Sequence, residues 1–213
     1  MSENTAIHDE NDYKVSFWWE LLCTLSLFIL YGFFVAAFSY KVYHDQSISA
    51  FLFLIYELMF LFMVVIRNLP KRVSASYYDW SIAIIGTVLP ILMRPVDIPN
   101  EHMLLIAMQF TGCVITVTGL LTLSRSFGLV AANRGIRTSG LYAYIRHPLY
   151  SGYFLSIGSF MIQNFSLINL VIFMSFASLK IMRIFAEEKL LLQDPKYKAY
   201  AEKTKWRLYP YIW

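Results

Sequence analysis

Long runs of apolar residues limit what this chain can fold into more than any other feature. About six such runs occur, at residues 17–40, 48–66, 80–93, 103–123, 149–162 and 167–186. A helix rises about 1.5 Å per residue, so roughly 20 apolar residues cross a hydrocarbon core of ~30 Å. The sequence therefore predicts an all-α, polytopic transmembrane helical bundle. Its last two runs, separated by a short polar turn, are expected to form a helical hairpin.

Composition supports this prediction. Of the 213 residues, 58% are hydrophobic and only 15% are charged, whereas soluble domains carry roughly 25% charged residues. A soluble domain of this length could not bury that much apolar surface. Aromatic residues make up 17% of the chain, which is typical of interfacial belts and helix packing in lipid. We therefore expect an integral membrane protein.

The charged residues and cysteines narrow the expected partners. The net charge is +4, and the basic residues flank apolar runs, which favours contact with membrane lipid headgroups over nucleic acid. Cys23 and Cys113 both fall inside apolar runs. They give neither a disulfide framework nor metal-ligand spacing. The sequence thus predicts no metal site and no nucleic-acid partner, and it does not specify an oligomeric state.

The distribution of Lys and Arg predicts the orientation in the membrane. If both termini are cytoplasmic, the outer loops contain only Lys41 and Arg94, and most basic residues, including four arginines of the 124–147 linker, lie inside. The positive-inside rule favours this arrangement. Residues 1–16 are acidic and polar, so we expect a disordered tail without the basic start of a signal peptide.

One candidate site lies where the linker meets the fifth apolar run. Arg146 and His147 directly precede Pro148, and proline suits the first turn of a helix because its missing N–H is not needed there. Free N–H groups of the new helix, beside two side chains that can carry positive charge, favour binding of an anion. The alternative is that both side chains merely anchor the helix at the headgroups.

Carboxylates form the second candidate cluster. Glu187 and Glu188 follow the sixth run, with Arg183 four residues earlier, a spacing that also suits an ordinary helix salt bridge. A hairpin would bring them close to the Arg-His pair. Glu57 interrupts the second run, where a carboxylate costs roughly 2.5–3.5 kcal/mol. It is expected to face protein or a cavity, either as a structural polar contact or as part of a site.

The combination of these features resembles the isoprenylcysteine carboxyl methyltransferase family, with its phospholipid methyltransferase relatives. The resemblance covers roughly residues 110–213. The matching elements are Arg146-His147-Pro148-x-Tyr150-x-Gly152, a short helical hairpin, Arg183 before Glu187-Glu188, a tyrosine-spaced segment, and Arg207-x-x-Pro210. Their order and spacing are more specific than any one motif alone.

The resemblance implies a membrane enzyme that transfers a methyl group from S-adenosylmethionine to a lipophilic acceptor, without a Rossmann domain. The expected organisation is an acidic disordered tail (1–16) and N-terminal membrane spans (17–109), followed by the part that the resemblance covers, a catalytic membrane core with a cytoplasmic C-terminal segment (110–213). The cofactor-binding residues that the resemblance implies are Arg146, His147, Tyr150, Glu187 and Glu188, with Gly152 allowing close approach. Arg183 or Arg207 is expected near the reacting end, and Glu57 is the leading base if the acceptor is an amine.

The preferred acceptor is a carboxylate, as in an isoprenylated cysteine. A carboxylate is ionised at neutral pH and needs no general base, only a cation to orient it and a dry site. The alternatives are a phospholipid N-methyltransferase and an NADPH-dependent enzyme similar to sterol reductases, which end in a comparable basic tail. A non-catalytic lipid-binding or scaffold protein is a further reading of the same apolar runs.

Overall fold

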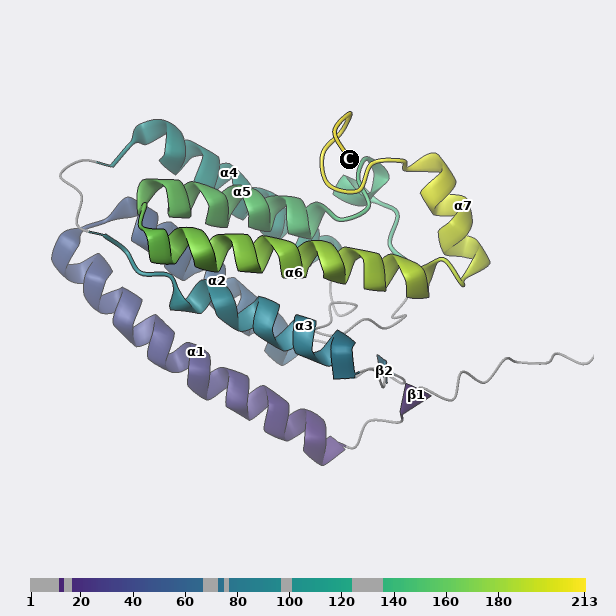
Figure 1. Cartoon of the computed structure of the whole chain (residues 1–213), viewed down its shortest axis with the longest axis horizontal. Helices are drawn as coiled ribbons and strands as arrows, with labels where there is room; N and C mark the ends of the chain where they lie inside the picture. The colour runs from purple at the N-terminus through teal and green to yellow at the C-terminus, as the bar shows by residue number, and fades with distance from the viewer. Residues whose placement is uncertain (1–11, 14–16, 67–72, 75–76, 97–100, 124–135) are drawn as a thin grey trace, which may run out of the picture.

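The computed structural model describes residues 12–13, 17–66, 73–74, 77–96, 101–123 and 136–213 (Figure 1). Most of the expected N-terminal tail lies outside these residues, as does the first half of the linker with Arg125 and Arg134. Asp12 and Tyr13 of that tail form a short strand, β1, which pairs antiparallel with β2 (Val73–Ser74).

Apart from this strand pair, the described elements are helical, which confirms the all-α prediction. Helices α1 to α6 run along the long axis of the molecule, and α7 lies at one end beside the C-terminus (Figure 1). The helices in chain order are α1 (Phe17–Asp45), α2 (Ile48–Ile66), α3 (Tyr77–Val88), η1 (Leu89–Leu92), α4 (Met103–Leu123), η3 (Gly140–Ala143), α5 (Pro148–Gln163), α6 (Leu167–Leu191) and α7 (Pro195–Lys203).

Among the described residues, α4 and α6 are long and apolar enough to cross a membrane, and shorter apolar helices cover residues 48–59 and 80–92. The remaining spans of the expected six stay a prediction. The third apolar run is not one uniform helix. It ends as the 3-10 turn η1, in which Pro90 is buried, because proline has no N–H to continue the α-helical ladder.

Helices α4 and α5 cross at two glycines. A methyl group added at Gly152 would lie 2.7 Å from the carbonyl oxygen of Gly112, and one added at Gly112 would lie 2.5 Å from the amide nitrogen of Ser156. Neither side has room for a side chain. This crossing fixes the start of α5 against α4, and it gives Gly152 a role in helix packing.

Helices α5 and α6 lie side by side, and the chain reverses direction between them (Figure 1). Pro148 begins α5, and the Ser166 hydroxyl caps α6 by accepting from the Asn169 amide. The Asn169 side chain also donates to the Asn164 carbonyl at 2.7 Å, which ties the turn together. The beginning of α5 therefore lies at the same end of the bundle as the last turns of α6.

Candidate functional site

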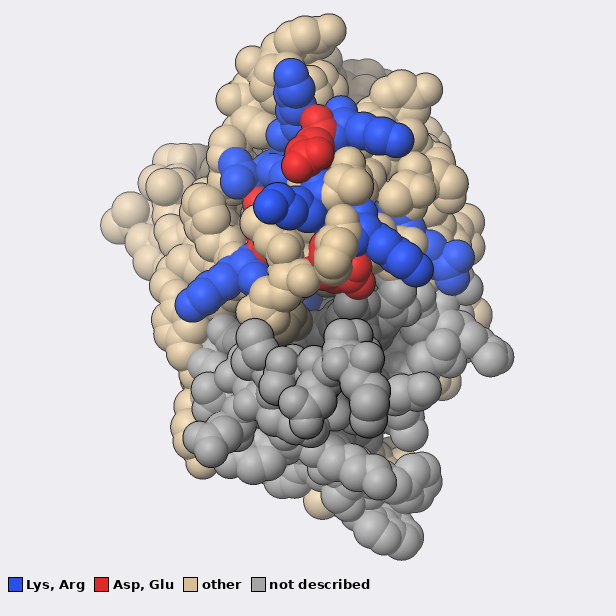
Figure 2. Space-filling view, turned by 90° about the vertical axis from the view of Figure 1, so that its right-hand side faces the viewer, with Lys and Arg blue, Asp and Glu red and all other residues tan. Residues whose placement is uncertain are grey.

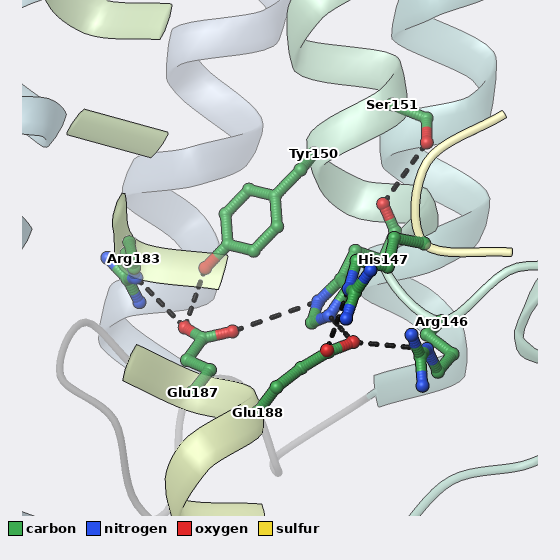
Figure 3. Close-up of polar contacts among 8 residues, drawn as sticks. Arg146, His147, Tyr150, Ser151, Arg183, Glu187 and Glu188 are labelled. Atoms are coloured by element: carbon green, nitrogen blue, oxygen red, sulfur yellow. Dashed lines mark hydrogen bonds and ion pairs between the residues drawn. The ribbon is translucent and has the colours of Figure 1, made fainter. Parts of the chain in front are cut away.

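The cluster at this end draws its side chains from three segments (Figure 3). Arg146 and His147 directly precede α5, Tyr150 lies in its first turn, and the glutamates lie in the last turns of α6. Arg207 comes from the C-terminal segment. Helix α6 continues beyond the predicted apolar run at 167–186, so both glutamates have helical backbone and project from fixed positions.

Glu187 is held by a tyrosine and an arginine. The Tyr150 hydroxyl donates to Oε1 of Glu187 at 2.6 Å, and Nε of Arg183 donates to the same oxygen at 2.9 Å. The second oxygen lies 4.0 Å from Nδ1 of His147. The sequence predicted the Arg183–Glu187 pair from its spacing, but the hydrogen bond from Tyr150 depends on the packing of α5 against α6.

Glu188 is contacted by three basic side chains. Nε of Arg207 donates to Oε2 at 2.8 Å, Nε2 of His147 lies 3.1 Å from Oε1, and Nε of Arg146 lies 3.0 Å from that same Oε1. Glu188 is only 3% exposed. Three guanidinium groups thus face two carboxylates in this cluster, so the site has a positive excess even with a neutral histidine and suits a further anion.

The C-terminal segment packs over the start of α5. Residues Ile145 and Trp206 form a parallel β-bridge, and the amides of Arg146 and His147 donate to the carbonyls of Trp206 and Arg207 at 2.9 and 2.8 Å. These backbone bonds bring Arg207, which is distant in sequence, into contact with Glu188.

Two further contacts hold this segment in place. The Ser151 hydroxyl donates to the Leu208 carbonyl at 2.6 Å, and the Tyr209 hydroxyl donates to the Ser151 carbonyl at 2.9 Å. The Arg207 guanidinium lies over the Trp213 ring at 5.3 Å from its centroid. The position of Arg207 is therefore set by both backbone and aromatic contacts.

Helix α7 adds tyrosines to one side of the site. The Tyr200 hydroxyl donates to the Tyr142 carbonyl at 2.6 Å, and burial raises the pKa of Tyr200 to about 12. Burial also raises the pKa of Tyr197. The negative charge of Glu188 raises this pKa further, and the positive charge of Arg146 lowers it in part. Both phenols are therefore neutral hydrogen-bond donors at physiological pH.

Two buried donors in this region have no hydrogen-bond partner among the described residues. They are Nε of Arg146, whose contact with Glu188 is an ion pair without hydrogen-bond geometry, and the hydroxyl of Tyr197. A buried donor without a partner is costly. These two atoms therefore provide binding capacity for a ligand that carries acceptor oxygens.

Lys and Arg side chains gather on this end of the molecule, around α7 and the end of α6 (Figure 2). The exposed lysines of this face are Lys189, Lys196, Lys198, Lys203 and Lys205. Such a face has an attractive potential for anions in water and for acidic lipid headgroups. The cluster thus lies where the apolar helices end and a basic surface begins.

The structure brings together most of the residues that the sequence singled out. Arg146, His147, Tyr150, Arg183, Glu187, Glu188 and Arg207 meet in one cluster. Gly152 instead faces α4 at the helix crossing, and Glu57 lines a cavity elsewhere in the bundle. Sequence reasoning missed Lys180 and Tyr197. The only signal for Lys180 was a lysine inside an apolar run.

Comparison with known proteins gives a family for this part of the chain. Residues 101–193 match the model of the isoprenylcysteine carboxyl methyltransferase (ICMT) family, and no curated protein gives a significant match. The matched segment contains α4, α5, α6 and every residue of the cluster except Arg207. Together with the apolar helices, this match indicates a membrane protein with methyltransferase ancestry. Residues 101–193 of this chain are therefore similar to the isoprenylcysteine carboxyl methyltransferase family.

Proposed function

We propose that this protein is an integral-membrane methyltransferase that uses S-adenosylmethionine to methylate a carboxylate on a lipophilic acceptor. The observation that carries the proposal is the buried cluster at the end of α5 and α6, in which Glu187 and Glu188 are surrounded by three arginines and a histidine. The family match agrees with this chemical class.

The residues present suit the polar ends of S-adenosylmethionine. Arg146 and Tyr197 have the unpartnered donors described above, which match the carboxylate of an amino-acid group. Glu187 and Glu188 have further lone pairs for an amino group or ribose hydroxyls. Tyr150 and His147 complete the proposed set, with their rings 5.7 Å apart.

When bound, the cofactor would supply a methyl group on a positively charged sulfur. With the cofactor held by the arginine and glutamate cluster, a carboxylate oxygen of the acceptor would take the methyl group as the S–CH₃ bond breaks, and the electron pair of that bond would stay on sulfur. No proton moves. The protein's task is alignment and exclusion of water, and alignment alone can supply ~7–11 kcal/mol.

The acceptor requires a cation to orient it. Arg183 and Arg207 are available for this role at the cluster, although each already pairs with a glutamate. An ammonium acceptor would need a base close to its nitrogen. Glu57, the candidate for that base, makes no hydrogen bond or ion pair with the glutamate cluster in the described part of the chain, which favours the carboxylate.

We further propose that the cluster and both termini face the cytoplasm. Supporting this, the basic surface of Figure 2 lies at the same end as the C-terminus, whereas Lys41, in the last turns of α1, and Arg94, in the loop after η1, lie at the other end. The positive-inside rule orients such a bundle with its basic end inward. The cofactor would then enter from water and the acceptor from lipid.

The first test is cofactor binding to the full chain in detergent. S-adenosylmethionine, or its demethylated product, at a hundred times its dissociation constant should add ~2.7 kcal/mol of apparent stability. His147→Ala should weaken this binding, whereas His44→Ala, at an exposed histidine on α1, should not. Stabilisation by NADPH instead would support a reductase, and stabilisation by neither would support a non-catalytic protein.

The second test identifies the methylated atom. After incubation with methyl-labelled cofactor and a lipid extract, a methyl ester releases volatile methanol in mild alkali, but an N-methyl group does not. Alkali-stable label in the lipid fraction would contradict the carboxylate proposal and favour a phospholipid N-methyltransferase.

A further inference from the structure

A small cavity lies within the bundle, apart from the glutamate cluster. Its volume is about 10 Å³, roughly enough for one water molecule. Helices α1, α2, α3, α5 and α6 all contribute to its wall. Its polar lining consists of Tyr31, Tyr56, Glu57, Thr87, Tyr153 and Lys180.

Lys180 is the unusual member of this lining. The side chain is 5% exposed, and its ammonium lies 5.4 to 5.9 Å from the ring centroids of Phe176, Tyr153 and Tyr150. In the described part of the chain it has no carboxylate within salt-bridge distance. Arg183 and Arg207, by contrast, each pair with a glutamate at 2.9 and 2.8 Å. Lys180 is thus a buried cation without a direct ion pair among the described residues, and Glu57, on the wall of the same cavity, is a carboxylate that compensates its charge at longer range.

Tyr153 provides a second donor on the same cavity. Its side chain is 4% exposed and its hydroxyl interacts with that of the neighbouring Tyr56, but it makes no hydrogen bond of standard geometry among the described residues. Across the cavity, Glu57 is hydrogen-bonded to Tyr31. The Lys180 ammonium and the Tyr153 phenol, both donors, suit a group with two acceptor oxygens.

Tyr150 connects this cavity to the glutamate cluster. Its hydroxyl donates to Glu187, while its ring lies 5.9 Å from both the Lys180 ammonium and the Arg183 guanidinium. A group held by Lys180 is therefore one side chain away from the cluster, on the side that faces the apolar bundle.

We propose that Lys180, assisted by Tyr153, binds the carboxylate of the lipophilic acceptor. Lys180 would then have the orienting role that the sequence assigned to Arg183 or Arg207. This inference rests on the proposed function. The cavity is too small for a carboxylate as it stands, so the Lys180 ammonium would move on its flexible four-carbon stem to meet the acceptor carboxylate at the Tyr150 side of the cavity. Lys180 acts as a substrate-binding residue and takes no part in bond making.

The test compares an acid with its uncharged ester. N-acetyl-S-farnesylcysteine and its methyl ester share every group except the charge, and their dissociation constants are measured with the full chain in nanodiscs. Wild type should bind the acid about tenfold or more tightly than the ester, the difference expected of one charge-assisted contact. In Lys180→Met this ratio should fall close to one.

Two variants separate binding from folding. Tyr153→Phe removes only the hydroxyl, so acid binding should weaken several-fold and ester binding should stay unchanged. Glu57→Gln should retain the preference for the acid. S-adenosylmethionine binding is measured in each variant, and it should stay within about twofold of wild type. If the wild type does not bind S-adenosylmethionine, the proposed function is contradicted, whatever the acid-to-ester ratio is.

Several results would overturn the assignment of Lys180. One is an acid-to-ester ratio that is unchanged in both Lys180→Met and Tyr153→Phe. Another is a wild type that does not prefer the acid. A third is a wild type that binds the cationic analogue S-farnesylcysteamine more tightly than the acid, with this preference abolished by Glu57→Gln. The last result would assign the cavity to an ammonium acceptor, with Glu57 as its partner.

Discussion

Replacing Glu188 with glutamine tests whether the cluster holds the C-terminal segment against α5. Glutamine keeps the shape of the side chain but removes the charge that faces Arg146, His147 and Arg207. The Arg146 side chain is 8% exposed, so it would keep a buried charge while losing its anion. Glu188→Gln should therefore destabilise the folded protein and weaken cofactor binding.

The magnitude follows from the burial of each partner. Removing one member of a buried ion pair costs about 3–5 kcal/mol, because the other charge is left uncompensated. Arg207 adds less, since its side chain is 30% exposed and partly hydrated. For a chain of this size, 1 kcal/mol shifts the unfolding temperature by roughly 2–4 °C. The expected fall in Tm is roughly 6–20 °C.

Thermal unfolding in detergent, at low and high salt, measures this effect. The loss should be similar at about 0.1 M and about 1 M salt, because buried pairs are poorly screened. Glu202→Gln, at an exposed glutamate of α7, is the matched control and should leave Tm unchanged. A Glu188→Gln variant as stable as this control, or one whose deficit disappears in high salt, would refute a buried ion-pair cluster.

Three further predictions address packing, topology and pH. Gly152→Ala should cost about 1–3 kcal/mol by overpacking, because the added methyl would lie 2.7 Å from a backbone carbonyl of α4, whereas Gly32→Ala, with nothing within 4 Å, should be neutral or stabilising in the same melts. A cysteine at the exposed Ser139 should resist an impermeant thiol reagent added outside intact cells, and labelling there would reverse the proposed topology. Burial raises the pKa of Tyr200 from 10 to about 12, so the folded state holds that proton more tightly and stability should fall by about 1.4 kcal/mol per pH unit between these values. Tyr200→Phe should lose less stability than wild type over that interval, and equal losses would contradict the assignment.

The sequence by itself determined the class of fold and the position of the main motif. Runs such as 103–123 and 167–186 must be helical in lipid, because only a helix satisfies their backbone polar groups internally without a closed barrel. Pro148 marked the start of α5, since proline is tolerated in the first turn of a helix. The i,i+4 spacing of Arg183 and Glu187 likewise defined a pair within one helix, and the structure contains that pair at 2.9 Å.

Only the tertiary structure decided which distant side chains meet. The contact of Arg207 with Glu188 depends on the β-bridge between Ile145 and Trp206, which no local pattern indicates. The cavity shared by Glu57 and Lys180 depends on how α2 and α6 are rotated about their own axes. Helical periodicity determines which residues share one face of a helix. The rotation and tilt of each helix are set by packing between helices, and at Gly152 that packing decided what the glycine contacts.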